Sequence, residues 1–178
     1  MVVLRRGYFG LAVMAGLAFS ATGTWAGGTP RGEAGYFDRP PIWTGLYGGL
    51  NLGHFDADRD DGLVGGVQVG YNWQNRQIIY GLEGDISIAN SDSIDWLGSV
   101  RGRLGYLLQP GLLVYGTAGV GVVSANDNDT GFVWGLGVEG RVTDTMTARL
   151  EYLNFDTDSH HGDGVNVIRA GVNFKLGR

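Results

Sequence analysis

The sequence predicts an all-β fold, an eight-stranded antiparallel up-and-down transmembrane β-barrel, and three observations support this prediction. From residue 43 onward, apolar and polar side chains alternate with the period of two that is typical of strands. One face of these segments is apolar and carries aromatic residues near its ends, whereas the opposite face collects the charges. The connections alternate between short turns and longer loops, as in transmembrane barrels.

The stretch 78–108 shows the pattern most clearly. Its apolar face is long and regular, and its polar face carries Glu83, Asp85, Arg101 and Arg103. Folding the stretch at its middle into a hairpin places Asp85 opposite Arg101 and Glu83 opposite Arg103. A soluble sandwich with a solvated charged face would give the same hairpin, so the choice between the two folds depends on the rest of the chain.

The composition limits the class of protein. A length of 178 residues suits one domain. The chain has 33 Gly, 17% charged residues and no Cys, which excludes disulfides and thiolate metal sites. The formal net charge of −5 argues against nucleic acid as a partner.

The N-terminal 26 residues are typical of a secretory signal peptide. Arg5 and Arg6 precede the apolar run 7–19, and a small residue suited to cleavage ends the segment. The run is shorter than the about 20 residues that a membrane-spanning helix needs; an uncleaved anchor is the alternative. Residues 27–42 hold three of the four prolines and predict an irregular lead on the periplasmic side, and 43–178 form the barrel.

Eight alternating segments follow the lead. The predicted strands are 43–55, 64–74, two within 78–108, 112–124, 131–142, 146–155 and 165–176. Each is near the about 9–11 residues that a tilted membrane strand requires. The longer connections, which hold nearly all the Asp residues, are 56–63, 89–95, 125–130 and 156–164. A soluble sandwich does not require short turns to alternate with longer loops, so this alternation favours the barrel.

Charged side chains are expected to fill the lumen. A sheet in hydrocarbon must close because no water satisfies an open edge, and eight strands leave an interior filled by side chains. The predicted lumen charges are Glu83, Asp85, Arg101, Arg103, Glu139, Arg141, Arg149, Glu151, Arg169 and Lys175. Hairpin counting places Glu139 near Arg149 and Glu151 opposite Arg169, and arginine can bind carboxylates through two parallel hydrogen bonds.

Aromatic residues near the strand ends predict anchors at the membrane interfaces. These interface aromatics are Trp43, Trp73, Tyr80, Trp96, Tyr106, Trp134 and Phe174.

Several short motifs resemble those of a known family. They are WTGLYGG at 43–49, GVQVGYN at 66–72, GLEGD at 81–85, SVRGRLGY at 99–106, YGTAGVG at 115–121 and RAGVNF at 169–174. Together they resemble the small outer-membrane β-barrel proteins of alphaproteobacteria, a porin family with an opacity-like or OmpA-like barrel domain. The resemblance implies an outer-membrane location, insertion by the barrel-assembly machinery, and roles in envelope integrity and surface exposure, without catalytic residues. The chain departs from the family at Leu176, where an aromatic residue is usual.

Motifs for cofactors and metals are weak. The glycine pattern at 135–140 matches a dinucleotide fingerprint, but an alternating strand follows it where a helix is required. His160, His161 and Asp163 could bind a metal, and the Asp clusters at 56–61 and 127–129 could bind Ca²⁺, yet both sets are expected to be solvated loops. No cofactor and no metal site are therefore predicted.

The sequence predicts an integral outer-membrane protein with a structural or surface role, its lumen filled by charged side chains. The expected partners are outer-membrane lipid, lipopolysaccharide and the assembly machinery. A narrow porin that passes ions or small solutes is the alternative. A second alternative is an enzyme that modifies outer-leaflet lipids; its candidate residues are His54, His160 and His161 with Ser87, Ser91, Ser93 and Ser124.

Overall fold

The computed structural model describes residues 42–57, 60–90, 95–124, 128–157 and 164–177. The described residues form eight strands: β1 (Gly45–Ala57), β2 (Asp60–Asn75), β3 (Ile78–Asn90), β4 (Trp96–Gln109), β5 (Leu112–Ser124), β6 (Asn128–Arg141), β7 (Met146–Thr157) and β8 (Val165–Leu176). Among them there is no helix of the length and apolarity that crossing a membrane requires. The predicted signal peptide and all but the last residue of the predicted lead lie outside the described residues.

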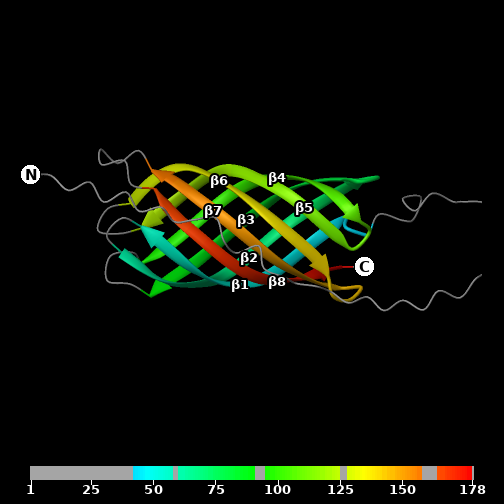
Figure 1. Cartoon of the computed structure of the whole chain (residues 1–178), viewed down its shortest axis with the longest axis horizontal. Helices are drawn as coiled ribbons and strands as arrows, with labels where there is room; N and C mark the ends of the chain where they lie inside the picture. Colours follow the sequence, from blue (N-terminus) through cyan, green and yellow to red (C-terminus); the bar gives the residue numbers. More distant parts are fainter. Residues whose placement is uncertain (1–41, 58–59, 91–94, 125–127, 158–163, 178) are drawn as a thin grey trace, which may run out of the picture. The chain divides into compact units, whose positions relative to one another are not determined.

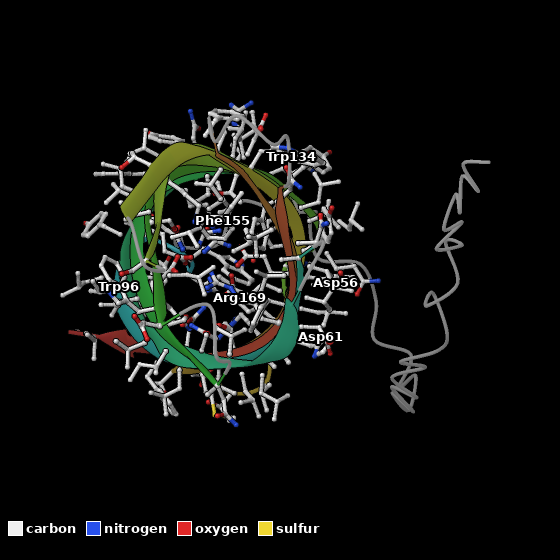
Figure 2. The ribbon with its side chains drawn as sticks, turned by 90° about the vertical axis from the view of Figure 1, so that its left-hand side faces the viewer. Asp56, Asp61, Trp96, Trp134, Phe155 and Arg169 are labelled. Atoms are coloured by element: carbon white, nitrogen blue, oxygen red, sulfur yellow. The ribbon has the colours of Figure 1, made fainter. Side chains whose placement is uncertain are left out.

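The strands close into one barrel in the order β1 to β8 (Figure 1). Each strand is antiparallel to its neighbours, and β8 returns to pair with β1 from Leu46↔Leu176 to Asp56↔Asn166. Figure 2, turned by 90° from Figure 1, shows the strands as a ring around the side chains of the lumen. The predicted fold class is confirmed.

In the middle of the barrel wall the apolar side chains point outward and the charged ones inward, as the alternation predicts. Leu136 is 61% exposed on the outer surface, whereas Arg101 is 1% and Glu151 2% exposed. Figure 2 shows Trp134 outside the ring and Arg169 inside it. This arrangement suits hydrocarbon outside and a polar interior.

Two of the strand pairs are longer than predicted. The pairing of β1 with β2 continues to Ala57↔Asp60, so most of the predicted loop 56–63 is strand, and β6 begins at Asn128 instead of residue 131. Acidic and small residues interrupt the apolar alternation here, but the backbone hydrogen bonds do not depend on side-chain polarity. The connections at this end, the loop end, are 58–59, 91–95, 125–127 and 158–164; those at the other end, the turn end, are 76–77, 110–111 and 142–145.

Apolar side chains also fill the two ends of the lumen, in contrast to the predicted filling by charged side chains. The loop-end cluster consists of Phe55, Val64, Leu97, Val123, Val133, Leu153, Phe155, Val165 and Val167. The turn-end cluster consists of Trp43, Ile79, Leu107, Leu113 and Tyr115. Figure 2 shows Phe155 directed into the ring. The predicted charged filling therefore occupies only the middle of the lumen.

The predicted interface aromatics divide into two groups. Trp73, Tyr80, Tyr106, Trp134 and Phe174 lie on the outer surface with exposed fractions between 40% and 48%, and Trp96 is partly buried. The prediction for Trp43 is wrong, because its side chain is 6% exposed within the turn-end cluster. Trp43 precedes β1, and its indole N–H donates to the carbonyl of Pro110 at 3.0 Å, which holds the ring at the turn end of the lumen.

Candidate functional site: the ionic layer of the lumen

Charged side chains from five strands meet between the two apolar clusters. Eight of the ten predicted lumen charges form this ionic layer: Glu83 and Asp85 on β3, Arg101 and Arg103 on β4, Glu139 on β6, Arg149 and Glu151 on β7, and Arg169 on β8. Four carboxylates thus face four guanidinium groups. The strand alternation aims all eight side chains into the barrel, and their equal numbers leave no uncompensated buried charge.

Glu83 is the hub of the ionic layer. Its carboxylate accepts hydrogen bonds from Arg149 at 2.5 Å and from Arg101 at 2.8 Å. The hydroxyl of Tyr47 donates to it at 2.6 Å. Arg103 and Arg169 also lie within 3.8 Å of its oxygens. Glu83 therefore links β3 to side chains from four other strands.

The remaining carboxylates are shared between arginines in the same way. Arg103 donates to Glu139 at 2.6 Å, which connects β4 to β6 across the barrel. Arg169 lies 2.7 Å from Glu151 and 3.1 Å from Asp85. Hydrogen bonds of this charge-assisted kind are stronger than neutral ones. The layer ties together strands that are not neighbours in the sheet.

The register of the β3–β4 hairpin corrects the predicted pairing. Glu83 lies opposite Arg101, and Asp85 lies opposite Ser99. The predicted pairs differ from these by a shift of two residues, which keeps every side chain on its own face. Arg101 still binds Asp85, at 2.7 Å, because its long side chain reaches diagonally along the lumen.

The other two predicted pairs have the expected register. Glu139 lies opposite Arg149 and Glu151 opposite Arg169. Only the second pair makes the expected ion pair, since Arg149 reaches across to Glu83 instead. An eight-stranded barrel is narrow enough for side chains to bind partners on the far wall.

Two predicted lumen charges lie outside the ionic layer. Arg141 pairs with Asp144 at 2.8 Å at the turn end, where the Asp144 carboxylate is fully exposed. The ammonium group of Lys175 is exposed and donates to the carbonyl of Ile42 at 3.4 Å. Both residues occupy the last inward position of their strands, where partners outside the lumen are available.

Two tyrosines complete the ionic layer and were absent from the predicted site. Besides the contact of Tyr47 with Glu83, the hydroxyl of Tyr115 donates to Glu151 at 3.1 Å. The guanidinium carbon of Arg103 lies 4.1 Å from the centre of the Tyr115 ring, a cation–π distance. Their inward position in the strand alternation was the available signal.

The cavity beside the ionic layer is too small for an organic ligand. A turn-end cavity of about 40 Å³ is lined by residues that include Tyr47, Asn72, Glu139 and Lys175. This volume holds a few water molecules and is far below the about 300–1,000 Å³ of a ligand pocket. Several buried guanidinium nitrogens have no protein acceptor, among them the Nε atoms of Arg101 and Arg103.

Some of the residues considered for a nucleotide, metal or enzyme site lie within the part of the chain that the structure describes. The glycine pattern at 135–140 lies inside β6, with no helix after it among the described residues. Among the described residues no group of three potential ligands is close enough to hold a metal ion. His54 lies outside the barrel near Asp61, at 3.7 Å, whereas Ser87 is buried in the lumen, so the wall separates them. His160, His161, Asp163, Ser91 and Ser93 lie outside the described residues.

Comparisons with known proteins agree with this geometry. The family model of the outer membrane protein beta-barrel domain matches residues 9–175. A 22 kDa outer membrane protein of Rhizobium leguminosarum bv. viciae is 38% identical over 166 residues, covering 75% of this chain and 78% of the relative. A 31 kDa outer-membrane immunogenic protein of Brucella melitensis biotype 1 is 28% identical over 201 residues, covering 75% and 84%.

The crystal structure of Ail, the attachment invasion locus protein of Yersinia pestis, is similar in fold. It superimposes with a TM-score of 0.52 at 16% identity and covers 75% of this chain and 97% of its own. At this identity the likeness concerns the barrel alone.

Proposed function

Because this chain belongs to the outer membrane protein beta-barrel domain family, we propose that it has a structural or surface role in the cell envelope and that its lumen is closed to ions. It is an outer-membrane protein with a buried charged network inside the barrel. In the orientation usual for such barrels the turn end faces the periplasm and the loop end faces outward.

The filling of the lumen in three layers is the observation that supports a closed barrel. An ion that enters from the loop end meets the apolar cluster around Phe55 and Phe155, where dehydration opposes passage. Beyond it, four arginines and four carboxylates are bound to one another. The turn-end cluster with Trp43 then fills the other opening.

Planar-bilayer recording tests the closed lumen. The refolded protein is expected to give no steady conductance step in salt solution. A variant that carries both Phe55→Ala and Phe155→Ala serves as the matched control, since it removes two rings from the loop-end cluster and leaves the ionic layer unchanged. Reproducible unitary steps from the unmodified protein would contradict the proposal.

A narrow ion-permeable pore is the second candidate, and one observation favours it. The turn-end cavity adjoins Glu139 of the ionic layer, and nearby guanidinium N–H groups lack protein acceptors. Water next to these groups would begin a hydrated path. The conductance of such a pore depends on the ionic layer, so Arg103→Gln would change the single-channel conductance. A closed barrel gives no conductance steps, either as the unmodified protein or as the Arg103→Gln variant.

A further inference from the structure

A row of polar side chains crosses the outer surface of the barrel at the loop end. The strand register places Trp134 beside Asn154, Asn154 beside Asn166, Asn166 beside Asp56, and Asp56 beside Asp61. The polar row, as we call these five residues, thus runs over β6, β7, β8, β1 and β2. Figure 2 shows Trp134, Asp56 and Asp61 on the outside of the ring.

On β8 the polar row meets the upper edge of the apolar band. Along β8, the outward residues Leu176, Phe174, Ala170 and Ile168 are exposed and apolar, and Asn166 is the next outward position. Ten residues separate Leu176 from Asn166, which is about 33 Å of strand. At a tilt of about 35–45° this length rises about 25 Å, the height of the apolar band of such barrels. Asn166 therefore lies at the level of the lipid headgroups.

Side chains in and beside the row hold one another in place. The Asn166 side-chain oxygen accepts hydrogen bonds from the Tyr152 hydroxyl at 2.6 Å and from the Asn154 amide at 2.9 Å. The rings of Trp134 and Tyr152 meet edge to face, with centroids 5.9 Å apart. Such contacts fix an aromatic surface next to a pair of amides.

The chemistry of the row matches a sugar. Amide and carboxylate oxygens accept hydrogen bonds from hydroxyl groups, and amide N–H groups donate to them. Aromatic rings offer an apolar face with a polar edge at the level of the headgroups. The charged members of the row, Asp56 and Asp61, are both acids, and their carboxylate oxygens accept hydrogen bonds from sugar hydroxyl groups.

From this arrangement we propose that the polar row binds the saccharide headgroup of an outer-leaflet glycolipid, the lipopolysaccharide of the outer membrane. The acyl chains of the same lipid then lie along the outward residues directly below the row, among them Leu136 and Ile168. The inference rests on the proposed outward orientation of the loop end, and it adds residues that would select a sugar-bearing lipid over a phospholipid.

Titration of the full-length protein in phosphatidylcholine nanodiscs with purified rough lipopolysaccharide tests the proposal. Replacing both amides (Asn154→Leu and Asn166→Leu) is expected to weaken binding roughly tenfold or more, as the loss of two or more hydrogen bonds implies. Asn90→Leu is the matched control, because Asn90 is an exposed residue at the loop end of β3, outside the row. Its binding should equal that of the unmodified protein.

Three further arms separate the sugar from other ligands. Binding should persist in EDTA and in Asp56→Asn, because neither removes the hydrogen-bonding groups; loss in both would indicate a divalent cation bridge and overturn the proposal. Phosphatidylglycerol, which is anionic but lacks the core sugars, should not compete. Lipid-free core oligosaccharide should compete.

The result is independent of the closed lumen. Heat-dependent gel mobility first establishes that each variant is a folded barrel. Equal lipopolysaccharide binding by the double Leu variant and by the unmodified protein would refute the sugar site, whatever the conductance measurement gives. Conversely, conductance by the unmodified protein would refute the closed lumen and leave the sugar site intact.

Discussion

Replacing Glu83 with Gln removes one charge from the centre of the ionic layer and leaves its shape almost unchanged. In the native barrel four carboxylates balance four guanidinium groups, and Arg101 and Arg149 donate to Glu83 at 2.8 and 2.5 Å. The variant keeps an oxygen that accepts one of these bonds, but the layer then carries one positive charge too many.

The expected loss is set by burial of the uncompensated charge. The side chains of Glu83, Arg101 and Arg149 are each 3% exposed or less, so water screens the excess charge poorly. Removing one partner of a buried ion pair costs about 3–5 kcal/mol. Because Gln retains one hydrogen-bond acceptor, we expect the Glu83→Gln variant to lose about 3 kcal/mol of unfolding free energy.

Urea unfolding in lipid vesicles, followed by tryptophan fluorescence and by gel mobility, measures this loss. Asp144→Asn is the control, since it breaks the exposed pair with Arg141 and should leave the midpoint unchanged. The double variant Glu83→Gln, Arg149→Gln restores the charge balance and should recover part of the stability. Unfolding of Glu83→Gln at the same urea concentration as the unmodified protein would contradict the expected cost of the uncompensated buried charge.

Two further substitutions test the apolar and the steric parts of the filling by the same unfolding measurement. Phe155→Ala removes a ring from the loop-end cluster and should cost about 3–5 kcal/mol, whereas Ile88→Ala on the outer surface, where Ile88 is 73% exposed, should cost much less; equal losses would contradict the cluster. Gly137→Ala should destabilise by about 1–3 kcal/mol, because a Cβ there would lie 2.4 Å from the Tyr115 ring. Gly102→Ala, with no neighbour nearer than 3.8 Å, should not; a larger loss at Gly102 than at Gly137 would count against this packing.

The closed barrel could be predicted because the alternation of apolar and polar residues gives two separate indications of it. Each strand shows which side chains share a face, and the inverted polarity of the faces shows which side meets lipid. Val100 and Arg101, for example, are adjacent in sequence, yet one is 62% and the other 1% exposed. Such contrast between neighbours leaves little freedom in the assignment of inside and outside.

The ion pairs were harder to predict because the alternation does not determine the register. A shift by one residue would exchange the two faces, but a shift by two keeps them, so both positions of Arg101 fit the pattern equally. In a hairpin the register follows from the turn type and the loop length, which the alternation does not show. Contacts across the lumen, such as Arg149 with Glu83, depend on the closure of all eight strands and have no signature in either strand alone.

The apolar clusters at the two ends do have a signal in the sequence. The inward face that carries the charges also carries Phe55, Leu97, Leu153 and Ile79, nearer the ends of their strands. Extending the alternation to both ends of each strand predicts inward apolar residues above and below the charges. Trp43 has the same inward parity as Tyr47 in the predicted strand 43–55, so the same extension places its side chain in the turn-end cluster, although β1 begins only at Gly45.

The arrangement of charges along the chain has a consequence for how the barrel assembles. Within the ionic layer, strands β3 and β4 contribute two acids and two arginines, and strands β6 to β8 contribute two of each as well, so each half of the layer is electrically neutral by itself. Each half of the layer can enter the bilayer without a net charge. The links between the halves, Arg149 with Glu83, Arg103 with Glu139 and Arg169 with Asp85, form only as the wall closes. Closure of the barrel then joins two electrically neutral halves of the ionic layer. Before closure, the charges within each half already balance.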